Sequence, residues 1–202
     1  MKKIRLLKTQ GFTTTIDRHN IPKDQVSEID GKMIVKLPTI DIAAGNKELD
    51  VARDNGAEIV YATTSIEQKL EDVLLTYFFG PFVGPDPRRD FFVYNVLQSS
   101  GLQFSFKKGL VCKIAAECDL LEGKTRSTLE GHLKKIMDWR NAFAHGRLQH
   151  DAQRGSSLRY YMGSPQVLAL TDEYWSTVEK CFEETHAILS EVRNKLGELY
   201  KQ

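Results

Sequence analysis

Cysteine, long apolar runs and glycine-rich phosphate loops are scarce in this 202-residue chain. Its three cysteines, Cys112, Cys118 and Cys181, are odd in number and form no CxxC pair, which argues against a disulfide framework and a zinc knuckle. We interpret them as reduced core residues. Neither GxxxxGK nor GxGxxG occurs, so the common phosphate-binding loop motifs are missing.

Signals for membrane insertion and secretion are also weak. The longest apolar-rich stretch, residues 73–84, is interrupted by Gly80 and Pro81 and is too short to span a bilayer. Residues 1–12 start with positive charge but lack the apolar segment of a secretion signal. We therefore expect a cytoplasmic protein that does not contact membranes.

The overall composition is that of a soluble globular chain. It is 41% hydrophobic and 27% charged, which is typical of one domain, or of one domain with an appendage. The formal net charge of +1 hides an uneven distribution. Residues 132–160 hold six basic and two acidic side chains, whereas residues 171–202 hold four basic and seven acidic ones. A polyanion would prefer the middle segment.

Residues 1–62 are expected to form a β-rich or irregular N-terminal extension. The runs KMIVKLPTID (32–41) and AEIVYATT (57–64) are β-prone, and glycine and proline punctuate the segment. We find no chemistry in it, and its role could be a small sheet, a partner surface or a lid. Residues 63–202 are assigned to a helical domain.

Helical periodicity and end signals dominate this second part. We expect helices that start at a capping box of Ser65 and Gln68, at Asp90, near Phe104, at a capping box of Ser127 and Glu130, and at Asp172 and Glu173. Gly80, Gly101, Gly123 and Gly146 are expected to end the first four. Residues 155–171 favour a β-hairpin that turns at residues 163–165. The expected fold class is therefore mainly α, with a hairpin before the last helix.

The last helix carries a long apolar seam that must be buried against something. Its members follow a 3,4 spacing: Trp175, Val178, Phe182, Thr185, Leu189, Val192, Leu196 and Leu199. Two interpretations remain open. The seam packs within one bundle, or it is shared with a second subunit.

The segment MDWRNAFAHGRL, residues 137–148, is the most informative in the sequence. The apolar stripe of Leu129, Leu133 and Ile136 continues in register onto Arg140, which predicts a guanidinium on the buried seam. An unpaired buried charge costs several kcal/mol, so such a cation must be paired, hydrated in a cleft or facing an anion.

Asn141 and His145 are four residues apart and so share one face of this helix. Arg140 lies about 140° around the helix from His145. Histidine exchanges protons near neutral pH, and arginine binds a phosphate through two hydrogen bonds. RNA cleavage through the 2′-hydroxyl needs a base, an acid and a cation, and it requires no metal.

One histidine does not easily serve as both base and acid, and one helix cannot aim both ends of this set at the same atom. A two-fold dimer would place two histidines and two arginines in one cleft, so the spacing suggests a composite site. Simpler interpretations stay open: His145 at a helix C-terminus before Gly146 interacts favourably with the dipole, and Arg140 could pair with an acid on a neighbouring helix.

The run RNAFAHG at the end of an amphipathic helix resembles the Arg-then-His motif of the HEPN superfamily. Members include prokaryotic toxins, abortive-infection proteins and RNA-processing enzymes. The preceding segment GLQFSFKKGLVCKIAAECDLL is similar to the helix before this motif in relatives such as the mannitol operon repressor group. The resemblance covers residues 65–200 and implies a bundle of four to five helices and a homodimer with the motif at its interface. It also implies that Arg140 and His145 are the catalytic pair and that Asn141 assists them.

The expected function is that of a metal-independent endoribonuclease that needs no cofactor, with a toxin or phage-defence role held in check by an antitoxin or regulatory partner. Weak candidates for RNA contacts are Lys134, Lys135 and Arg147. The alternative is a non-catalytic regulatory or partner-binding dimer, as in many relatives.

Three other kinds of site are disfavoured. His132, His145 and His150 lack the i, i+4 spacing of a helical zinc site, so we expect no metal. The sequence places no base or acid near Ser156 or Ser157, which argues against a serine hydrolase. No helix-turn-helix is evident either, so direct DNA reading is not expected.

Overall fold

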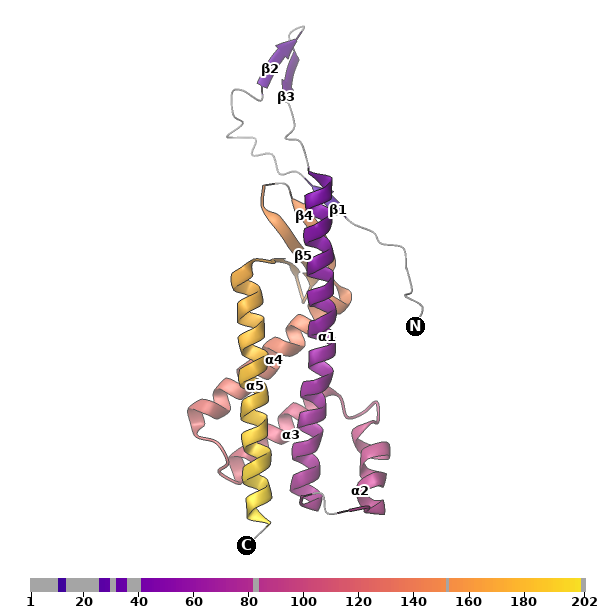
Figure 1. Ribbon diagram of the computed structural model, residues 1–202, viewed down its shortest axis with the longest axis vertical. Helices are drawn as coiled ribbons and strands as arrows, with labels where there is room; N and C mark the ends of the chain where they lie inside the picture. The colour runs from indigo at the N-terminus through magenta and orange to yellow at the C-terminus, as the bar shows by residue number, and fades with distance from the viewer. Residues whose placement is uncertain are drawn as a thin grey trace. The chain divides into compact units, whose positions relative to one another are not determined.

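The computed structural model describes residues 11–13, 26–29, 32–35, 41–81, 84–151 and 153–200, and within them the chain is mainly helical (Figure 1). The helices are α1 (Ile42–Phe79), α2 (Pro87–Phe92), α3 (Phe104–Glu117), α4 (Gly123–His145) and α5 (Asp172–Leu199), with a π-helical segment η2 (Val93–Leu97) after α2. The strands are β1 (Gly11–Thr13), β2 (Val26–Ile29), β3 (Lys32–Val35), β4 (Arg147–Asp151), β5 (Gly155–Tyr161) and β6 (Pro165–Ala169). The mainly helical fold class with a hairpin before the last helix is confirmed.

The chain forms two compact units. The helical unit comprises the described residues of 58–140 and 176–202, and the sheet unit comprises those of 1–57 and 141–175. Helices α1, α4 and α5 each contribute to both units. The domain boundary expected between residues 62 and 63 falls inside α1, so no break in secondary structure marks it.

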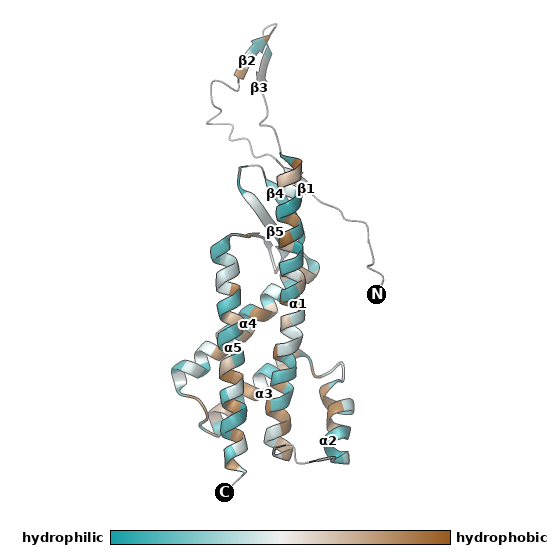
Figure 2. Ribbon diagram, in the orientation of Figure 1, coloured by the Kyte–Doolittle hydropathy of each residue, from teal (hydrophilic) through white to brown (hydrophobic). Residues whose placement is uncertain are grey.

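The helical unit is built around one apolar core. Four of its helices each supply a side chain that is at most 1% exposed: Leu70 of α1, Val111 of α3, Leu133 of α4 and Leu189 of α5. Burying each such side chain stabilises the unit by about 1.5–3 kcal/mol. In Figure 2, hydrophobic and hydrophilic residues alternate along α5, as expected for an amphipathic helix with one buried face.

Helix α5 and the part of α1 in the helical unit run in parallel. Lys69 Nζ donates to Ser190 Oγ at 3.1 Å, and further along the chain the hydroxyl of Tyr200, the residue after α5, donates to the Tyr77 carbonyl oxygen of α1. The contact with the higher residue number in α1 also has the higher residue number at the α5 end, so the two helices point the same way. The seam of α5 is thus used inside this unit, with Val178, Leu189 and Val192 all buried.

A charged cluster also lies at the edge of this core. The Lys107 side chain is only 4% exposed, and its Nζ donates to Glu67 Oε1 at 2.7 Å and to Glu71 Oε1 at 2.5 Å. Burial lowers the pKa of Lys107, but the two hydrogen bonds outweigh it and the net shift is upward. The cluster joins α3 to α1.

The sheet unit contains a four-stranded sheet in the order β1-β4-β5-β6. β1 pairs with β4 in parallel, and the other neighbours are antiparallel. The hairpin of β5 and β6 confirms the expected one, and Gly163 adopts a φ of 73° at its turn. β2 and β3 form a separate antiparallel pair, which confirms that the run KMIV is a strand.

The expectations for residues 42–62 and for the start of the first long helix are wrong. Helix α1 begins at Ile42, where Asp41 Oδ1 accepts hydrogen bonds from the Ala43 and Ala44 backbone N–H groups. The run AEIVYATT is therefore helical, and Ser65 lies inside the helix. Eight buried positions from 49 to 73 follow a strict 3,4 spacing along α1: Leu49, Ala52, Gly56, Ile59, Thr63, Ile66, Leu70 and Val73. Tertiary burial of that stripe overrides the local β preference.

Four other expected helix ends differ from the structure. The helical segment expected to end at Gly101 ends at Leu97, the last residue of η2. Gly123 begins α4 and does not end the preceding helix, which stops at Glu117. Ser127 lies within α4, where its hydroxyl donates to the Gly123 carbonyl oxygen at 2.9 Å. α2 opens at Pro87, three residues before the expected Asp90, because Asp86 caps it.

Candidate active site

The RNAFAHG segment lies where α4 ends and the chain enters β4. His145 is the last residue of the helix, as expected, and the Gly146 N–H donates to the Ala142 carbonyl oxygen at 2.7 Å. A Cβ atom at Gly146 would lie 2.3 Å from that oxygen and 2.7 Å from Leu158 Cδ1. Space therefore requires glycine here, and the close turn fixes where His145 lies.

All three residues of the predicted catalytic set are exposed on α4. Asn141 and His145 belong to the sheet unit and lie one turn apart on one face of the helix. Arg140 is the last α4 residue of the helical unit. Each side chain is thus open to a large ligand such as RNA.

The expectation that Arg140 lies on a buried seam is wrong. Leu129, Leu133 and Ile136 are fully buried, but Arg140, which continues their stripe, is exposed. The core of the helical unit ends on α4 before this turn, and burial shifts to Ala142, which is 2% exposed. Arg140 consequently bears little of the desolvation cost that a core position would impose.

The predicted RNA-contacting residues are exposed as well. Lys134 and Lys135 lie on α4, and Arg147 is the first residue of β4. The structure adds Arg159 of β5, which lies directly opposite Arg147 and is also exposed. Like charges at directly opposed positions destabilise a sheet, so this pair favours an anionic partner.

Glu48, His150 and Ser156 form a polar cluster in the sheet unit. The Ser156 hydroxyl donates to Glu48 Oε2 at 2.9 Å. His150 Nδ1 lies 3.2 Å from Ser156 Oγ and also 3.2 Å from Glu48 Oε2. The expectation that Ser156 has neither a base nor an acid beside it is therefore wrong. Its proton points at a carboxylate and not at the imidazole, unlike in a hydrolase triad. The cluster joins α1 to the sheet beside a pocket of about 670 Å³ that Arg154 and Trp175 also line.

His132, in the basic run, has a structural environment. Its Nε2 lies 3.7 Å from Glu184 Oε2, and burial lowers its pKa despite that carboxylate. Its backbone oxygen faces Cys181 Sγ at 4.0 Å. The pKa of Cys181 is raised to about 11 by burial, so its thiol is not reactive. This part of the run belongs to the contact between α4 and α5.

The described parts of the chain contain no group of three or more His, Cys, Asp or Glu side chains that could hold a metal ion. Over the same residues, no helix is both long and apolar enough to cross a membrane. All three cysteines are free thiols.

No family model, curated protein or solved structure matches this chain.

Proposed function

We propose that this protein is a metal-independent endoribonuclease of the HEPN type that acts at the C-terminal end of α4. The observation that carries the proposal is the exposure of Arg140, Asn141 and His145 together at that helix end. Arginine can bind a phosphate through two hydrogen bonds, and histidine can exchange a proton near neutral pH. Their exposure at one helix end puts both groups where a phosphate ester in solution can reach them.

The surrounding charge supports an RNA substrate. Two exposed arginines, Arg147 of β4 and Arg159 of β5, lie directly opposite each other. Strand β4 starts two residues after His145, so Arg147 is close in the chain to the proposed site. Such a pair gains stability when a phosphate lies between its guanidinium groups. Lys134 and Lys135 extend the positive surface along α4.

In the proposed reaction, a neutral His145 removes the proton from the ribose 2′-hydroxyl. The resulting oxygen attacks the adjacent phosphorus, and the bond to the 5′-oxygen breaks as that oxygen receives a proton from a second, protonated histidine. Arg140 stabilises the negative charge on the phosphoryl oxygens, and Asn141 orients the histidine or a hydroxyl. The products carry a 2′,3′-cyclic phosphate and a 5′-hydroxyl.

The need for a base and an acid leads to a homodimer as the active form. A two-fold axis beside α4 repeats each residue, so one cleft receives two histidines and two arginines. The resemblance to HEPN proteins supports the same arrangement. It also supports a cytoplasmic toxin or phage-defence role with an antitoxin or regulatory partner.

The test is cleavage of a mixed-sequence single-stranded RNA in EDTA by the wild type, His145→Ala and Arg140→Ala. His186→Ala is the matched control, because His186 is also an exposed helical histidine but lies on α5. Both site variants should lose at least about 100-fold in rate, as expected for a proton-transfer group or a phosphate cation, and His186→Ala should retain full activity.

Melting temperature and dimer mass are measured for every variant, so that loss of fold is separated from loss of chemistry. Wild-type protein that is inert on several RNAs, or a His145→Ala variant that cleaves at the wild-type rate, overturns the nuclease proposal. Equal inertness of all variants favours the regulatory dimer.

A further inference from the structure

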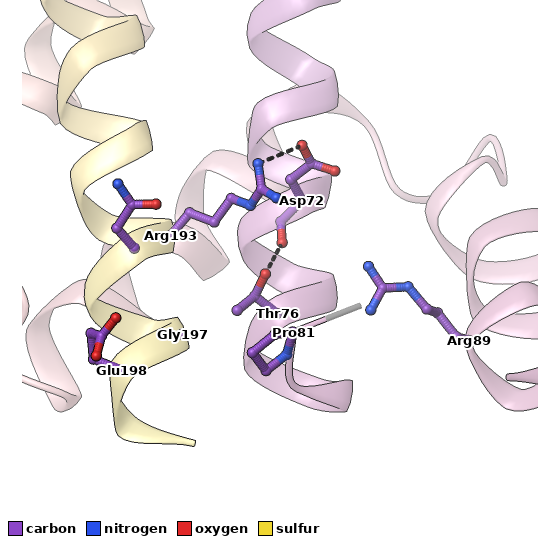
Figure 3. A pocket seen from close by; sticks show the side chains of 8 residues that line it. Asp72, Thr76, Pro81, Arg89, Arg193, Gly197 and Glu198 are labelled. Atoms are coloured by element: carbon purple, nitrogen blue, oxygen red, sulfur yellow. Dashed lines mark hydrogen bonds and ion pairs between the residues drawn. The ribbon is translucent and has the colours of Figure 1, made fainter. Parts of the chain in front are cut away.

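A second polar pocket lies in the helical unit, at the end where α1 and α5 both finish. It has a volume of about 340 Å³, within the range of small-ligand sites. Figure 3 shows its lining: Asp72, Thr76, Pro81, Arg89, Arg193, Asn194, Gly197 and Glu198. All belong to the helical unit, and none belongs to the proposed nuclease site.

The charges that line this pocket balance. Asp72 and Glu198 are acidic, and Arg89 and Arg193 are basic, so each sign is supplied twice. The two arginines come from different helices, α2 and α5, as do the two acids, α1 and α5. A ligand of a single charge sign would be repelled by half of these groups, whereas a zwitterion would match both.

One ion pair in the lining is loosely held. Arg193 reaches from α5 to Asp72 on α1 in Figure 3, but Nη1 and Oδ2 are 3.8 Å apart, and the side chains are 57% and 49% exposed. An exposed pair of this length contributes at most about 1 kcal/mol. A ligand can therefore insert its own charges between these two groups at small cost.

Glycine at position 197 keeps the pocket open. Gly197 lies inside α5, where glycine costs about 1 kcal/mol relative to alanine, and its φ is not in the left-handed region. A Cβ there would meet only Pro81 Cγ, at 3.9 Å. The backbone does not require glycine at this position, but a larger side chain would occupy the pocket.

We propose that this pocket binds a small zwitterion that carries a carboxylate and an ammonium group, of the free α-amino acid class. The carboxylate is received by the Arg193 guanidinium and the Asn194 amide, and the ammonium group by the Asp72 carboxylate. Arg89, whose Nη1 donates to the Gly80 carbonyl oxygen at 3.3 Å, and Glu198 are the other charged residues of the lining. The volume accommodates an amino acid with its side chain.

The experiment measures binding of each of the twenty L-amino acids to the full chain by ligand-observed NMR, followed by calorimetry for those that bind. Acetate, ethylammonium and inorganic phosphate are the single-charge comparators. At least one amino acid should bind at least about tenfold more tightly than all three, since it alone satisfies both signs.

Three variants locate the site. Arg193→Gln and Asp72→Asn should each weaken binding at least about tenfold, by removing one charged partner. Gly197→Leu should abolish it by filling the pocket, and leucine favours the helix, so folding is retained. His186→Ala, on α5 but outside the lining, should bind as the wild type does.

Several results would overturn the proposal. Phosphate or acetate binding as tightly as any amino acid would make this an anion site. Comparable binding of ethylammonium would make it a cation site. Absence of binding at millimolar concentrations, or full binding in Gly197→Leu, would show that the pocket is not the site. None of these results depends on RNA cleavage.

Discussion

At the residue scale, exposure separates the charged side chains of this protein into two kinds. Lys107 is buried and holds two carboxylates, whereas Arg140 and His145 are exposed at a helix end. A buried charge with satisfied partners positions helices. An exposed one is in contact with solvent and can be reached by a ligand, and for this reason we place the proposed site at the α4 end and not at the Lys107 cluster.

The Lys107 cluster gives a first prediction. Lys107→Met should reduce the free energy of unfolding by about 2 kcal/mol or more, because Glu67 and Glu71 would remain side by side without a cation. The triple variant Lys107→Met, Glu67→Gln, Glu71→Gln should recover part of that loss. Urea unfolding measures both. A triple variant less stable than the single one would show that the carboxylates contribute independently of Lys107.

The opposed arginines of β4 and β5 give a second prediction. Arg159→Gln should raise the free energy of unfolding by about 0.2–1 kcal/mol by removing like-charge repulsion from Arg147. It should also weaken RNA binding. The slope of the logarithm of RNA affinity against the logarithm of salt concentration should become shallower by about one. Lys113→Gln, an exposed cation on α3, is the control and should change neither. Lower stability with unchanged RNA affinity would contradict the assignment of this pair.

At the element scale, the sequence predicts best where local signals and burial agree. In α5, the acidic first turn and the 3,4 stripe mark the same helix that the structure shows, from Asp172 to Leu199. The sequence pattern does not predict the first half of α1. Its buried stripe passes through Ala52, Gly56 and Thr63, whose side chains are small, absent or polar and so add little to a helical pattern of hydrophobic residues. Gly56 is required there by packing, since a Cβ would lie 2.5 Å from Phe143 Cδ1.

The site was partly predictable for the same reason. The helix end at His145 and the shared face of Asn141 and His145 follow from local spacing. The exposure of Arg140 depends on where the core of the helical unit ends, which the stripe alone does not specify. The hydrogen bond from Ser156 to Glu48 could not be predicted from the sequence, because 108 residues separate the two in the chain.

The junction of α4 with β4 gives a third prediction. Gly146→Ala should reduce the free energy of unfolding by about 1–3 kcal/mol, because the new Cβ collides with a backbone oxygen and with Leu158. Gly131→Ala, in the same helix with nothing within 4 Å of its Cβ, should instead stabilise the protein by up to about 1 kcal/mol. Unfolding followed by circular dichroism compares them. A neutral Gly146→Ala would mean that the turn can relax.

At the scale of the whole molecule, the proposed chemistry and the stability are supplied by different side chains. The large apolar core lies in the helical unit, whereas His145, Asn141 and the opposed arginines lie in the sheet unit and Arg140 is the exposed last α4 residue of the helical unit. Substitutions of the exposed Arg140, Asn141 and His145 side chains should therefore change activity with little loss of stability. The central claim is that two copies of the chain complete one RNA-cleaving site.

Mixing of wild-type and His145→Ala subunits tests that claim most directly. The two proteins are unfolded and refolded together with the variant in roughly ninefold excess, and RNA cleavage in EDTA is measured per wild-type chain. A mixed dimer holds a single His145 and lacks either the base or the acid, so only dimers of two wild-type chains should cleave RNA. The rate per wild-type chain should therefore fall about tenfold below that of wild-type protein refolded alone, whereas an unchanged rate would contradict a site shared between two copies.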